Sequence, residues 1–436
     1  MLMCLFCLGA FAQIQAQKPN TTQKILITNV NVFNGVDNTI HKNQYILIEN
    51  NLIKKIGEIS DAPKDVGEVI DAKGYYAIPG LIDAHVHLMQ ESVNQADFLT
   101  SDFVFLNFIA AKAAKKQLMR GFTTVRDLGG GALALARAID AGLVEGPRVF
   151  PSGAFISQTA GHGDFGMFTD VPRDGNLTYW ERQGVYAIAD GVDQVLQRSR
   201  EQLRQGATQL KLMAGGGISS AYDPIEVTQY SEAELAAAVG AAKDWDTYVT
   251  VHAYGDRSVQ RAIRAGVTNI EHGHLVRDIT TVKMMKDHDV IWSIQPFYYD
   301  HLSKPTEKSR EVYTSTGIIY DLARKYGVKM AFGADLLFSS KRAETQGQRL
   351  AALHTLFGFS PFETLNMATV KNFELLQRSN KRNPYPAGKL GQITAGAYAD
   401  LIIVNDNPLK HLRLIEKPDE NFLLIMKDGR IFKNNL

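Results

Sequence analysis

The stretch that decides the fold of this 436-residue chain is Ile78-Pro79-Gly80-Leu81-Ile82-Asp83-Ala84-His85-Val86-His87. Its apolar residues predict a buried β-strand over Ala77–Ile82 that leads into two histidines. His85 and His87 are two positions apart, and side chains two apart on a strand point to the same face. The pair can therefore hold one metal ion, although an isolated H-x-H pair is weak evidence for a metal site.

Four further segments also place a metal-ligand side chain near the end of a predicted strand. They are Leu210-Lys211-Leu212-Met213, Val251-His252-Ala253, Ile270-Glu271-His272 and Phe332-Gly333-Ala334-Asp335. A lone strand histidine is more often a core or rim residue, and a lone aspartate after a strand is more often a helix cap. The recurrence of such residues at successive strand ends favours a binuclear metal site, and therefore a hydrolase.

The middle of the chain alternates apolar strand patterns with helical patterns. Helices are predicted in the Ala/Lys-rich run before Leu118 and over Val185–Leu203, and the S-x-x-E motifs at Ser231 and Ser360 are capping boxes. The predicted strands are Ala77–Ile82, Thr123–Asp127, Val149–Ala154, Gln209–Met213, Tyr248–His252, Asn269–His272, Val290–Ile294 and Lys329–Phe332. Eight strands, each followed by a helix, predict an α/β protein with a TIM-like (β/α)8 barrel over residues 79–386. Active sites of such barrels lie at the carboxyl ends of the strands.

Both ends of the chain carry short alternating apolar runs separated by turn residues, a pattern typical of antiparallel strands. The runs are Ile25–Ile27, Tyr45–Ile48, Ile53–Ile56, Gly391–Ile393, Ala399–Val404, Phe422–Met426 and Arg430–Phe432. We expect residues 24–78 and 387–436 to form one small β-sandwich domain built from both termini.

The first twelve residues are apolar and carry both cysteines, Cys4 and Cys7. This run is too short to span a membrane, and with small residues at Ala10, Ala12 and Ala16 it predicts a signal peptide over residues 1–16. The chain is then expected to be exported, to the periplasm or outside the cell, although its first basic residue, Lys18, comes late. A buried N-terminal strand is the alternative reading.

The charge balance is close to neutral, with 47 Lys and Arg against 46 Asp and Glu. We therefore expect no nucleic acid as a partner, and no stable insertion in a membrane. The expected partner is a small molecule or a dipeptide, and a homo-oligomer is compatible with the sequence.

Lys211 is unusual because it lies between Leu210 and Leu212 in an otherwise apolar strand. Burial of an ammonium is costly and favours loss of its proton. The neutral amine can then take up carbon dioxide and become a carbamate, an anion with two oxygens able to bridge two metals. A lysine at a strand end with its ammonium in solvent is the alternative. The histidines and the aspartate at the ends of the other strands favour the carbamate instead.

The ligand types indicate the metal. Imidazole and carboxylate suit zinc and similar divalent ions, and a metal pair roughly 3.5–4 Å apart can activate water and polarise a carbonyl. His274 is interpreted as a supporting residue outside the ligand set. No surrounding motif supports a role for five other histidines, His41, His288, His301, His354 and His411.

The chain resembles the amidohydrolase superfamily over nearly its whole length after the leader. The quoted stretch at Ile78–His87 resembles the N-terminal signature, and Gly391–Leu401 resembles the C-terminal one. Within the superfamily the chain is similar to the imidazolonepropionase-like branch, which includes Xaa-Pro dipeptidase-type enzymes, carboxypeptidases acting on dipeptides and N-acyl amino acids, and ochratoxin-hydrolysing amidases. The segments that carry this second resemblance are Thr159–Asp164, Lys211–Gly217, His252–Gly255 and Glu271–His274.

The resemblance implies a role for each residue. His85, His87 and Asp335 would hold a first metal ion, His252 and His272 a second, and carboxylated Lys211 would bridge two divalent ions, most simply Zn²⁺. Asp335 would also be the catalytic acid and base. His162 and Tyr254 match positions that contact the terminal carboxylate of the substrate in peptidase members, and Gly215-Gly216-Gly217 would leave room for substrate.

We therefore expect a metal-dependent amidohydrolase that cleaves an amide or peptide bond in dipeptides or N-acyl amino acids with a free carboxylate. A mononuclear cyclic-amide hydrolase or deaminase is the main alternative. A non-catalytic metal-binding scaffold is a remote one, because all six ligand positions are filled.

Overall fold

The computed structural model describes residues 23–64, 66–173, 175–220, 222–303 and 305–436. The predicted signal peptide over residues 1–16, with Cys4 and Cys7, lies outside the described residues. None of the helices in the described part has the length and apolar character needed to cross a membrane.

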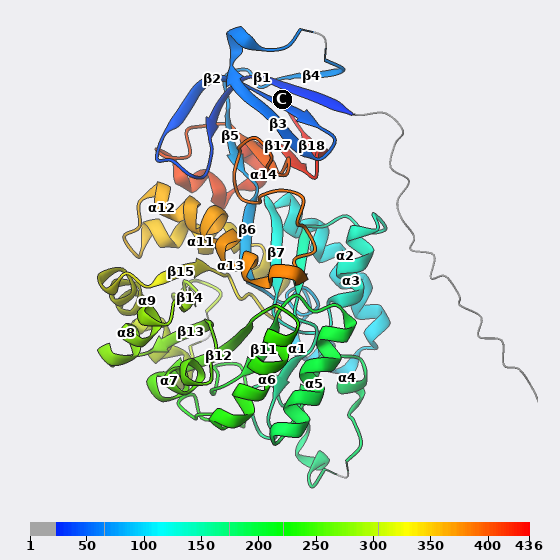
Figure 1. Ribbon diagram of the computed structural model, residues 1–436, viewed down its shortest axis with the longest axis vertical. Helices are drawn as coiled ribbons and strands as arrows, with labels where there is room; N and C mark the ends of the chain where they lie inside the picture. The colour runs from blue at the N-terminus through cyan, green and yellow to red at the C-terminus, as the bar shows by residue number, and fades with distance from the viewer. Residues whose placement is uncertain (1–22, 65, 174, 221, 304) are drawn as a thin grey trace, which may run out of the picture.

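Strands from both ends of the chain form one eight-stranded sheet, at the top of Figure 1. Its order is β18-β17-β16-β5-β1-β2-β3, with β4 beside β1. The bounds are β1 Lys24–Phe33, β2 Ile40–Glu49, β3 Leu52–Glu58, β4 Glu68–Asp71, β5 Tyr76–Pro79, β16 Leu401–Val404, β17 Phe422–Lys427 and β18 Arg430–Asn434. The antiparallel pairing of β16 with β5 joins the two ends, and a core that includes Ile46 and Leu401 lies within this sheet. The structure gives the strands as a single sheet, so the division into two layers of a sandwich stays a prediction, and the run Gly391–Ile393 is not a strand.

The middle of the chain forms two parallel sheets. The smaller one is β6 (Leu81–Val86), β7 (Phe122–Asp127) and β8 (Arg148–Pro151). The larger one runs in the order β10 (Tyr186–Ile188), β9 (Phe155–Ser157), β11 (Leu210–Met213), β12 (Val249–Gly255), β13 (Asn269–Leu275), β14 (Ile291–Ile294) and β15 (Lys329–Phe332). Every residue of β11 and β13 is buried, as expected for parallel strands that are covered on both faces.

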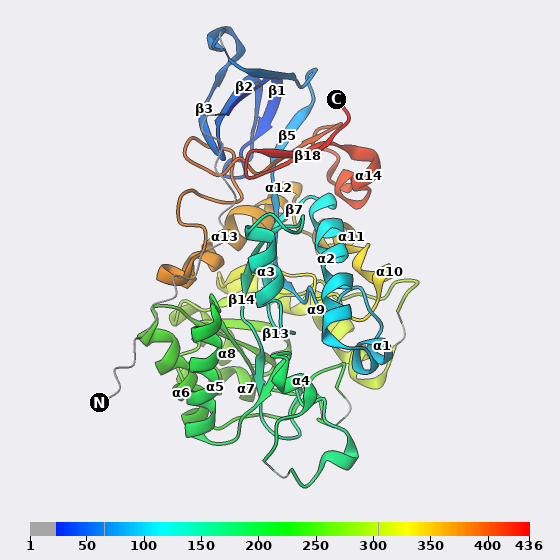
Figure 2. The same cartoon turned by 90° about the vertical axis from the view of Figure 1, so that its right-hand side faces the viewer.

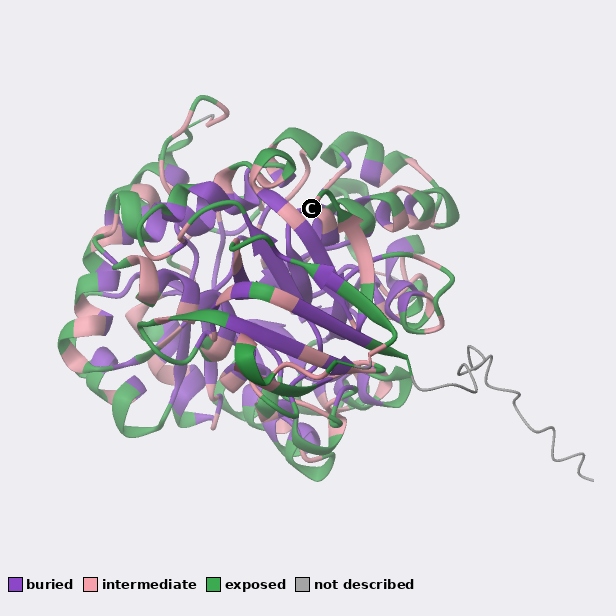
Figure 3. Ribbon diagram, turned by 90° about the horizontal axis from the view of Figure 1, so that it is seen from above, coloured by how far each residue is buried: buried purple, intermediate pink, exposed green. Residues whose placement is uncertain are grey.

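Helices follow most of the parallel strands and cover them. In Figure 3, seen from above, the strands of the terminal sheet lie nearest the viewer, and helices with exposed outer faces surround them. The longer helices are α2 Phe103–Met119, α3 Leu133–Asp140, α5 Val192–Gln205, α6 Glu232–Asp244, α7 Asp256–Arg264, α8 Ile279–Asp287, α9 Glu307–Tyr326 and α11 Gln346–Thr355. The shorter ones are α1 Gln95–Thr100, α4 Tyr179–Arg182, α10 Ser340–Ala343, α12 Pro361–Asn366, α13 Asn372–Leu376 and α14 Pro418–Asn421. The capping boxes predicted at Ser231 and Ser360 are confirmed at the starts of α6 and α12. Figure 2 shows the terminal sheet above the parallel strands and their helices after a turn of 90° about the vertical axis.

Three predicted elements are wrong in extent, and the simplest case is the predicted strand Val149–Ala154, which ends at Pro151 in β8. The predicted strand Ala77–Ile82 is two strands, because at Gly80 the chain passes from β5 in the terminal sheet to β6 in the parallel one. A Cβ at Gly80 would lie 2.1 Å from Thr123 Oγ1, so only glycine allows this close approach. The predicted helix Val185–Leu203 begins with strand β10, and α5 starts only after Gly191, whose φ of +86° favours glycine.

The two parallel sheets meet at the carboxyl ends of β6 and β15. Here Asp335 N–H donates to His85 O at 2.9 Å and Ala334 N–H donates to Asp83 Oδ1 at 3.1 Å. In the described part of the chain no ladder joins β15 to β6 or β8 to β9. The α/β class with parallel strands and covering helices is therefore confirmed, and closure into an eight-stranded barrel stays a prediction.

Candidate active site

A cavity of about 260 Å³ lies where the carboxyl ends of the parallel strands converge. All eight side chains predicted for the site line it: His85, His87, His162, Lys211, His252, Tyr254, His272 and Asp335. They come from five strands and from the loop after β9, over 250 positions of the chain. None of the five histidines without a supporting motif is among the residues that line this cavity.

Asp335 lies at the centre of the ligand set. Its Oδ1 lies 3.4 Å from His85 Nε2 and 3.5 Å from His87 Nε2. This oxygen is buried and has no hydrogen-bond partner in the described part of the chain. Ligand atoms of His85, His272 and Asp335 all lie within 4.8 Å of one another. An unpartnered buried carboxylate oxygen among imidazole nitrogens fits a divalent cation, which would compensate for its burial.

Three of the histidines are oriented by a contact at the ring nitrogen that faces away from this centre. His85 Nδ1 lies 2.8 Å from Glu271 Oε2, His87 Nδ1 lies 3.1 Å from Gly129 O, and His252 Nε2 lies 2.9 Å from Gly216 O. Such outer contacts fix the tautomer of metal-binding histidines and leave the other nitrogen free to coordinate.

Burial keeps the imidazoles of His87, His252 and His272 neutral. It lowers the pKa of His87 to about 4, and it lowers the pKa of His252 and of His272 well below the usual value. Neighbouring imidazoles and the Lys211 charge lower these pKa values further. Neutral imidazole is the form that binds a metal ion, so the site is in its ligand form at neutral pH.

Lys211 is 1% exposed, which excludes the reading of a lysine with its ammonium in solvent. Within the described chain its Nζ makes no hydrogen bond and no ion pair closer than 4 Å. Burial lowers the pKa of Lys211 to about 8, against an opposing effect of the Glu271 and Asp335 charges. A buried ammonium without a partner is unfavourable, so this position favours the neutral amine or a modified form of it.

A buried ion pair beneath the site was missed by the sequence analysis. Arg126 Nη2 lies 2.5 Å from Glu271 Oε1, and the other carboxylate oxygen of Glu271 is the one that contacts His85. Thr250 Oγ1 also donates to Glu271, at 2.7 Å, and Tyr248 and Asn269 accept from Arg126 Nη1. Arg126 and its neighbours hold the pKa of Glu271 well below its usual range, although burial opposes this. The only signal in the sequence was a charged residue within each of two apolar strands.

His272 has an unusual backbone conformation. Its φ is +74°, and the next residue, Gly273, has a φ of +68°. A Cβ at Gly273 would lie 2.3 Å from Trp292 Nε1, and the same indole N–H donates to His272 O at 2.8 Å. Strained backbone of this kind is found at functional sites, where packing holds it. Here it turns the His272 ring towards the cavity side of β13.

His162 is placed by two loops. Its ring stacks on His252 with 4.0 Å between centroids, and its Nδ1 lies 2.8 Å from Ser220 Oγ. A Cβ at Gly217 would lie 2.0 Å from His162 Cε1, so the triple glycine makes room for His162 itself. Lys308 of α9 donates to three carbonyls of the 217–223 segment and fixes the loop that carries Ser220.

Tyr254 stacks on His272, with 4.9 Å between centroids and 10° between the ring planes. Its hydroxyl makes no hydrogen bond with another described residue, and burial raises the pKa of Tyr254 well above its usual value. The hydroxyl is therefore a free donor at the cavity. His274, interpreted as a supporting residue, does not line the cavity, and its Nε2 lies 2.9 Å from Gln295 O.

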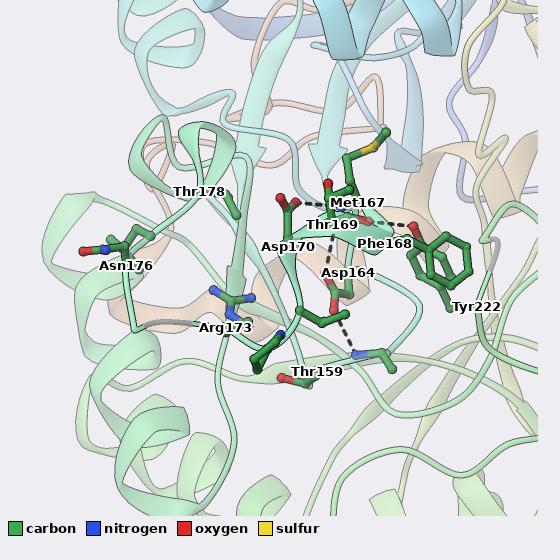
Figure 4. Close-up of a pocket in the computed structure, with 15 residues that line it drawn as sticks. Thr159, Asp164, Met167, Phe168, Thr169, Asp170, Arg173, Asn176, Thr178 and Tyr222 are labelled. Atoms are coloured by element: carbon green, nitrogen blue, oxygen red, sulfur yellow. Dashed lines mark hydrogen bonds between the residues drawn. The ribbon is translucent and has the colours of Figure 1, made fainter.

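A larger cavity, of about 720 Å³, lies beside this one in the loop over residues 159–178 and includes Tyr222 (Figure 4). Asp164 accepts from Ala160 N–H and Gly166 N–H, and Tyr222 Oη donates to Gly166 O. None of the eight predicted site residues lines it, so the chemistry belongs to the smaller cavity.

Several known proteins resemble this chain in sequence and structure. The ochratoxinase of Aspergillus niger is 29% identical over 424 residues, which cover 90% of this chain and 83% of that protein. Its crystal structure superposes with a TM-score of 0.81 at 26% identity, covering 95% of this chain and 96% of that one. A prolidase solved in complex with N-methylphosphonate-L-proline has a TM-score of 0.82 at 32% identity, covering 94% and 100% of the two chains.

A Xaa-Pro dipeptidase with bound methionine is also similar, with a TM-score of 0.79 at 27% identity, covering 94% of this chain and 100% of that one. The model of the amidohydrolase family matches residues 76–432, from the last strand of the N-terminal segment to the last strand of the chain. This chain therefore belongs to the amidohydrolase family and is a hydrolase of amide bonds.

Proposed function

We propose that this protein uses two divalent metal ions, most simply Zn²⁺, to hydrolyse the amide bond of N-acyl amino acids or dipeptides that have a free carboxylate. The observation that carries the proposal is the convergence of six possible ligands on one cavity, among them Asp335 and the buried Lys211, which has no partner in the described chain. His85, His87 and Asp335 would hold one ion, and His252 and His272 the other. When bound, such ions supply a Lewis acid for the scissile carbonyl and lower the pKa of water to near neutrality.

Lys211 would bridge the two ions as a carbamate. Its neutral amine attacks carbon dioxide, a C–N bond forms, and one proton is released to solvent. The product has two oxygens and one negative charge in place of an unpartnered ammonium. This change agrees with the position of Lys211, which is 1% exposed and depressed in pKa by burial.

Asp335 would move the proton. Its Oδ1 has no hydrogen-bond partner in the described chain and can accept a proton from the attacking water. The same oxygen can then deliver the proton to the nitrogen of the leaving amine, which completes the hydrolysis. His85 Nε2 and His87 Nε2 lie beside this carboxylate, at 3.4 and 3.5 Å, where a shared metal ion would hold the three groups together.

His162 and Tyr254 would bind the carboxylate of the substrate. The single hydroxyl proton of Ser220 is better placed for His162 Nδ1, at 2.8 Å, than for Gly217 O, at 3.3 Å. Donation to Nδ1 leaves the proton of the neutral ring on His162 Nε2, where it can be donated to a carboxylate. The free Tyr254 hydroxyl is a second donor. A similar prolidase was solved with N-methylphosphonate-L-proline, a compound with a carboxylate, which supports the proposed class of substrate.

The test is Tyr254→Phe, assayed on an N-acyl amino acid and on its C-terminal amide. The wild-type protein should prefer the acid, and the variant should lose about tenfold in kcat/KM on the acid because one hydrogen bond to a charged group is lost. The amide should be affected less. An equal loss on both substrates, or a wild-type protein that hydrolyses neither, contradicts the proposal.

A mononuclear cyclic-amide hydrolase or deaminase is the second candidate. It is favoured by one observation: among the residues that the structure describes, His85, His272 and Asp335 are the only group of three ligands whose atoms all lie within 4.8 Å of one another. Elemental analysis separates the two, since one ion per chain supports the mononuclear enzyme and two support the binuclear one.

The remaining expectations belong to the same proposal. We propose that the two parallel sheets are arcs of one (β/α)8 barrel and that residues 24–78 and 387–436 form a β-sandwich domain. We also propose that residues 1–16 direct export. Burial of the strands between helices supports the barrel.

A further inference from the structure

The cavity has a polar end that the proposed mechanism does not use. Gln90, which follows the His87 segment, and Arg342, in α10 after β15, both line it. These residues follow β6 and β15, whereas Tyr254 lies on β12, three strands from β15 in the seven-stranded sheet. The predicted carboxylate donors and this second polar end therefore come from different strands around the cavity.

Arg342 has a positive charge without a partner. Its guanidinium makes no hydrogen bond and no ion pair closer than 4 Å with any described residue. Asp300 is the acid that responds to its charge, but that carboxylate is already paired with Arg349. A guanidinium in a cavity wall that pairs with no described acid is available to bind an anion, since its planar donors match a carboxylate.

Gln90 is a second, independent indication of a ligand. It is only 2% exposed, and its Nε2 is buried without a hydrogen-bond partner in the described chain. Buried amide donors are normally satisfied, and exceptions in a cavity wall indicate a partner supplied by a ligand or by water. Phe338 N–H donates to the backbone oxygen of Gln90 at 3.0 Å, so the segment that leads to Arg342 is fixed against Gln90.

The surroundings of these two groups are apolar. Leu337, Phe338 and Phe155 line the same cavity. Such walls suit a short methylene chain that ends in a charged group, and the cavity of about 260 Å³ restricts the chain to a few carbons. A free α-ammonium group is disfavoured here, because Arg342 has the same charge.

We propose that Arg342 and Gln90 form an anion subsite for the acyl part of the substrate, which would carry a carboxylate of its own. The substrate class is then N-acyl amino acids with a short dicarboxylic acyl group, such as succinyl or glutaryl. This inference rests on the proposed function, because it assumes that the amino-acid carboxylate lies at His162 and Tyr254 and that the scissile amide lies between the two subsites.

The experiment compares two substrates of the metal-loaded full chain, the N-succinyl and the N-succinamoyl derivatives of one amino acid. They differ only in whether the acyl group ends in a carboxylate or in a neutral amide. The wild-type protein should favour the succinyl compound by about tenfold in kcat/KM, mainly through KM, as expected for one charged hydrogen-bonded contact. Arg342→Met should reduce this ratio to near one, and Arg342→Lys should retain part of it.

Lys341→Met is the matched control. Lys341 is the neighbouring, exposed cation and does not line the cavity, so its replacement should leave the ratio unchanged. A wild-type protein without a preference, or a preference that survives Arg342→Met, overturns the inference. A ratio that falls equally in Lys341→Met also overturns it, because the effect would then be one of general surface charge.

Calorimetric binding of the same two compounds separates this inference from the proposed function. Selective binding of the succinyl compound, lost in Arg342→Met, with no turnover of either compound, would support the subsite and contradict the proposed hydrolysis. Turnover of both compounds without selective binding would support the hydrolysis and contradict the subsite.

Discussion

Two buried lysines in different regions of the molecule have similar proton affinities and opposite surroundings. Lys427 lies on β17 of the terminal sheet and is 8% exposed, and Lys211 lies on β11 at the cavity and is 1% exposed. Burial lowers the pKa of each to about 8. Lys427 Nζ donates to Gly146 O at 2.9 Å, whereas Lys211 Nζ has no such partner in the described chain.

The contacts around Lys427 show that it has a structural role. Nearby, Arg148 of β8 pairs with Asp400 and Asp428 of the C-terminal segment, with Nε 3.1 Å from Asp400 Oδ2. These contacts join the terminal sheet to the parallel strands, and the acids compensate for the buried cations. Lys211 has no equivalent function in the fold. A depressed pKa therefore does not by itself identify a functional lysine, and the absence of a partner is the distinguishing feature.

The largest effect is expected when the lysine at the cavity, Lys211, is replaced. Lys211→Ala should lose most bound metal and reduce kcat by more than about 100-fold, since loss of a ligand should exceed the effect of losing an outer contact. Lys427→Ala should lower thermal stability and leave the metal content of the folded protein unchanged. Elemental analysis and turnover assays measure both variants. Equal metal content in the two variants would contradict a bridging role for Lys211.

A second variant tests the buried carboxylate that supports the metal ligand His85. Glu271→Gln removes the charge that pairs with Arg126 and orients His85. We expect metal affinity to fall about 10–100-fold and the folded state to lose about 3–5 kcal/mol, as for a broken buried ion pair. Competition with a chelator and denaturant unfolding measure the two effects.

Glu232→Gln is the matched control, because it breaks an exposed pair with Arg264 at 2.9 Å, away from the cavity. Exposed pairs contribute little, so both properties should remain near those of the wild-type protein. Normal metal affinity in Glu271→Gln would show that His85 does not need its outer carboxylate.

The smallest expected effect is a change in pH dependence. The pKa of Lys427 is about 8 in the folded protein and near 10.5 in the unfolded chain, so the unfolded chain binds more protons between these values. The free energy of unfolding should therefore rise with pH between about pH 8 and 10.5. Lys427→Met should flatten this rise, as measured by denaturant unfolding at several pH values. An unchanged slope would mean that Lys427 is not depressed in the folded protein.

Much of the site could be predicted because its signals are local. The spacing of His85 and His87, and the ends of the apolar runs before Lys211, His252 and His272, depend only on strand periodicity. The rule that active sites lie at the carboxyl ends of parallel strands then predicts that these residues meet. The capping boxes at Ser231 and Ser360 are local in the same way.

The first and last residues of helices and strands were harder to predict where tertiary contacts override the local sequence pattern. The apolar run Ala77–Ile82 is continuous in sequence, and only the approach of Thr123 to Gly80 shows that it divides between two sheets. Likewise, β10 pairs with β9, some thirty residues earlier in the chain, and its three residues are too few to interrupt a helical pattern.

The sequence by itself determined the family resemblance, the α/β class and the ligand types, because strand periodicity and residue chemistry depend only on residues close together in the chain. Only the tertiary structure decided that Arg126 supports His85 through Glu271 and that Gly217 makes room for His162. It also decided that the side-chain nitrogens of Arg342 and Gln90 have no partner among the described residues. These facts depend on contacts between residues up to 186 positions apart, as for His85 and Glu271, and no local pattern encodes which polar groups find a partner.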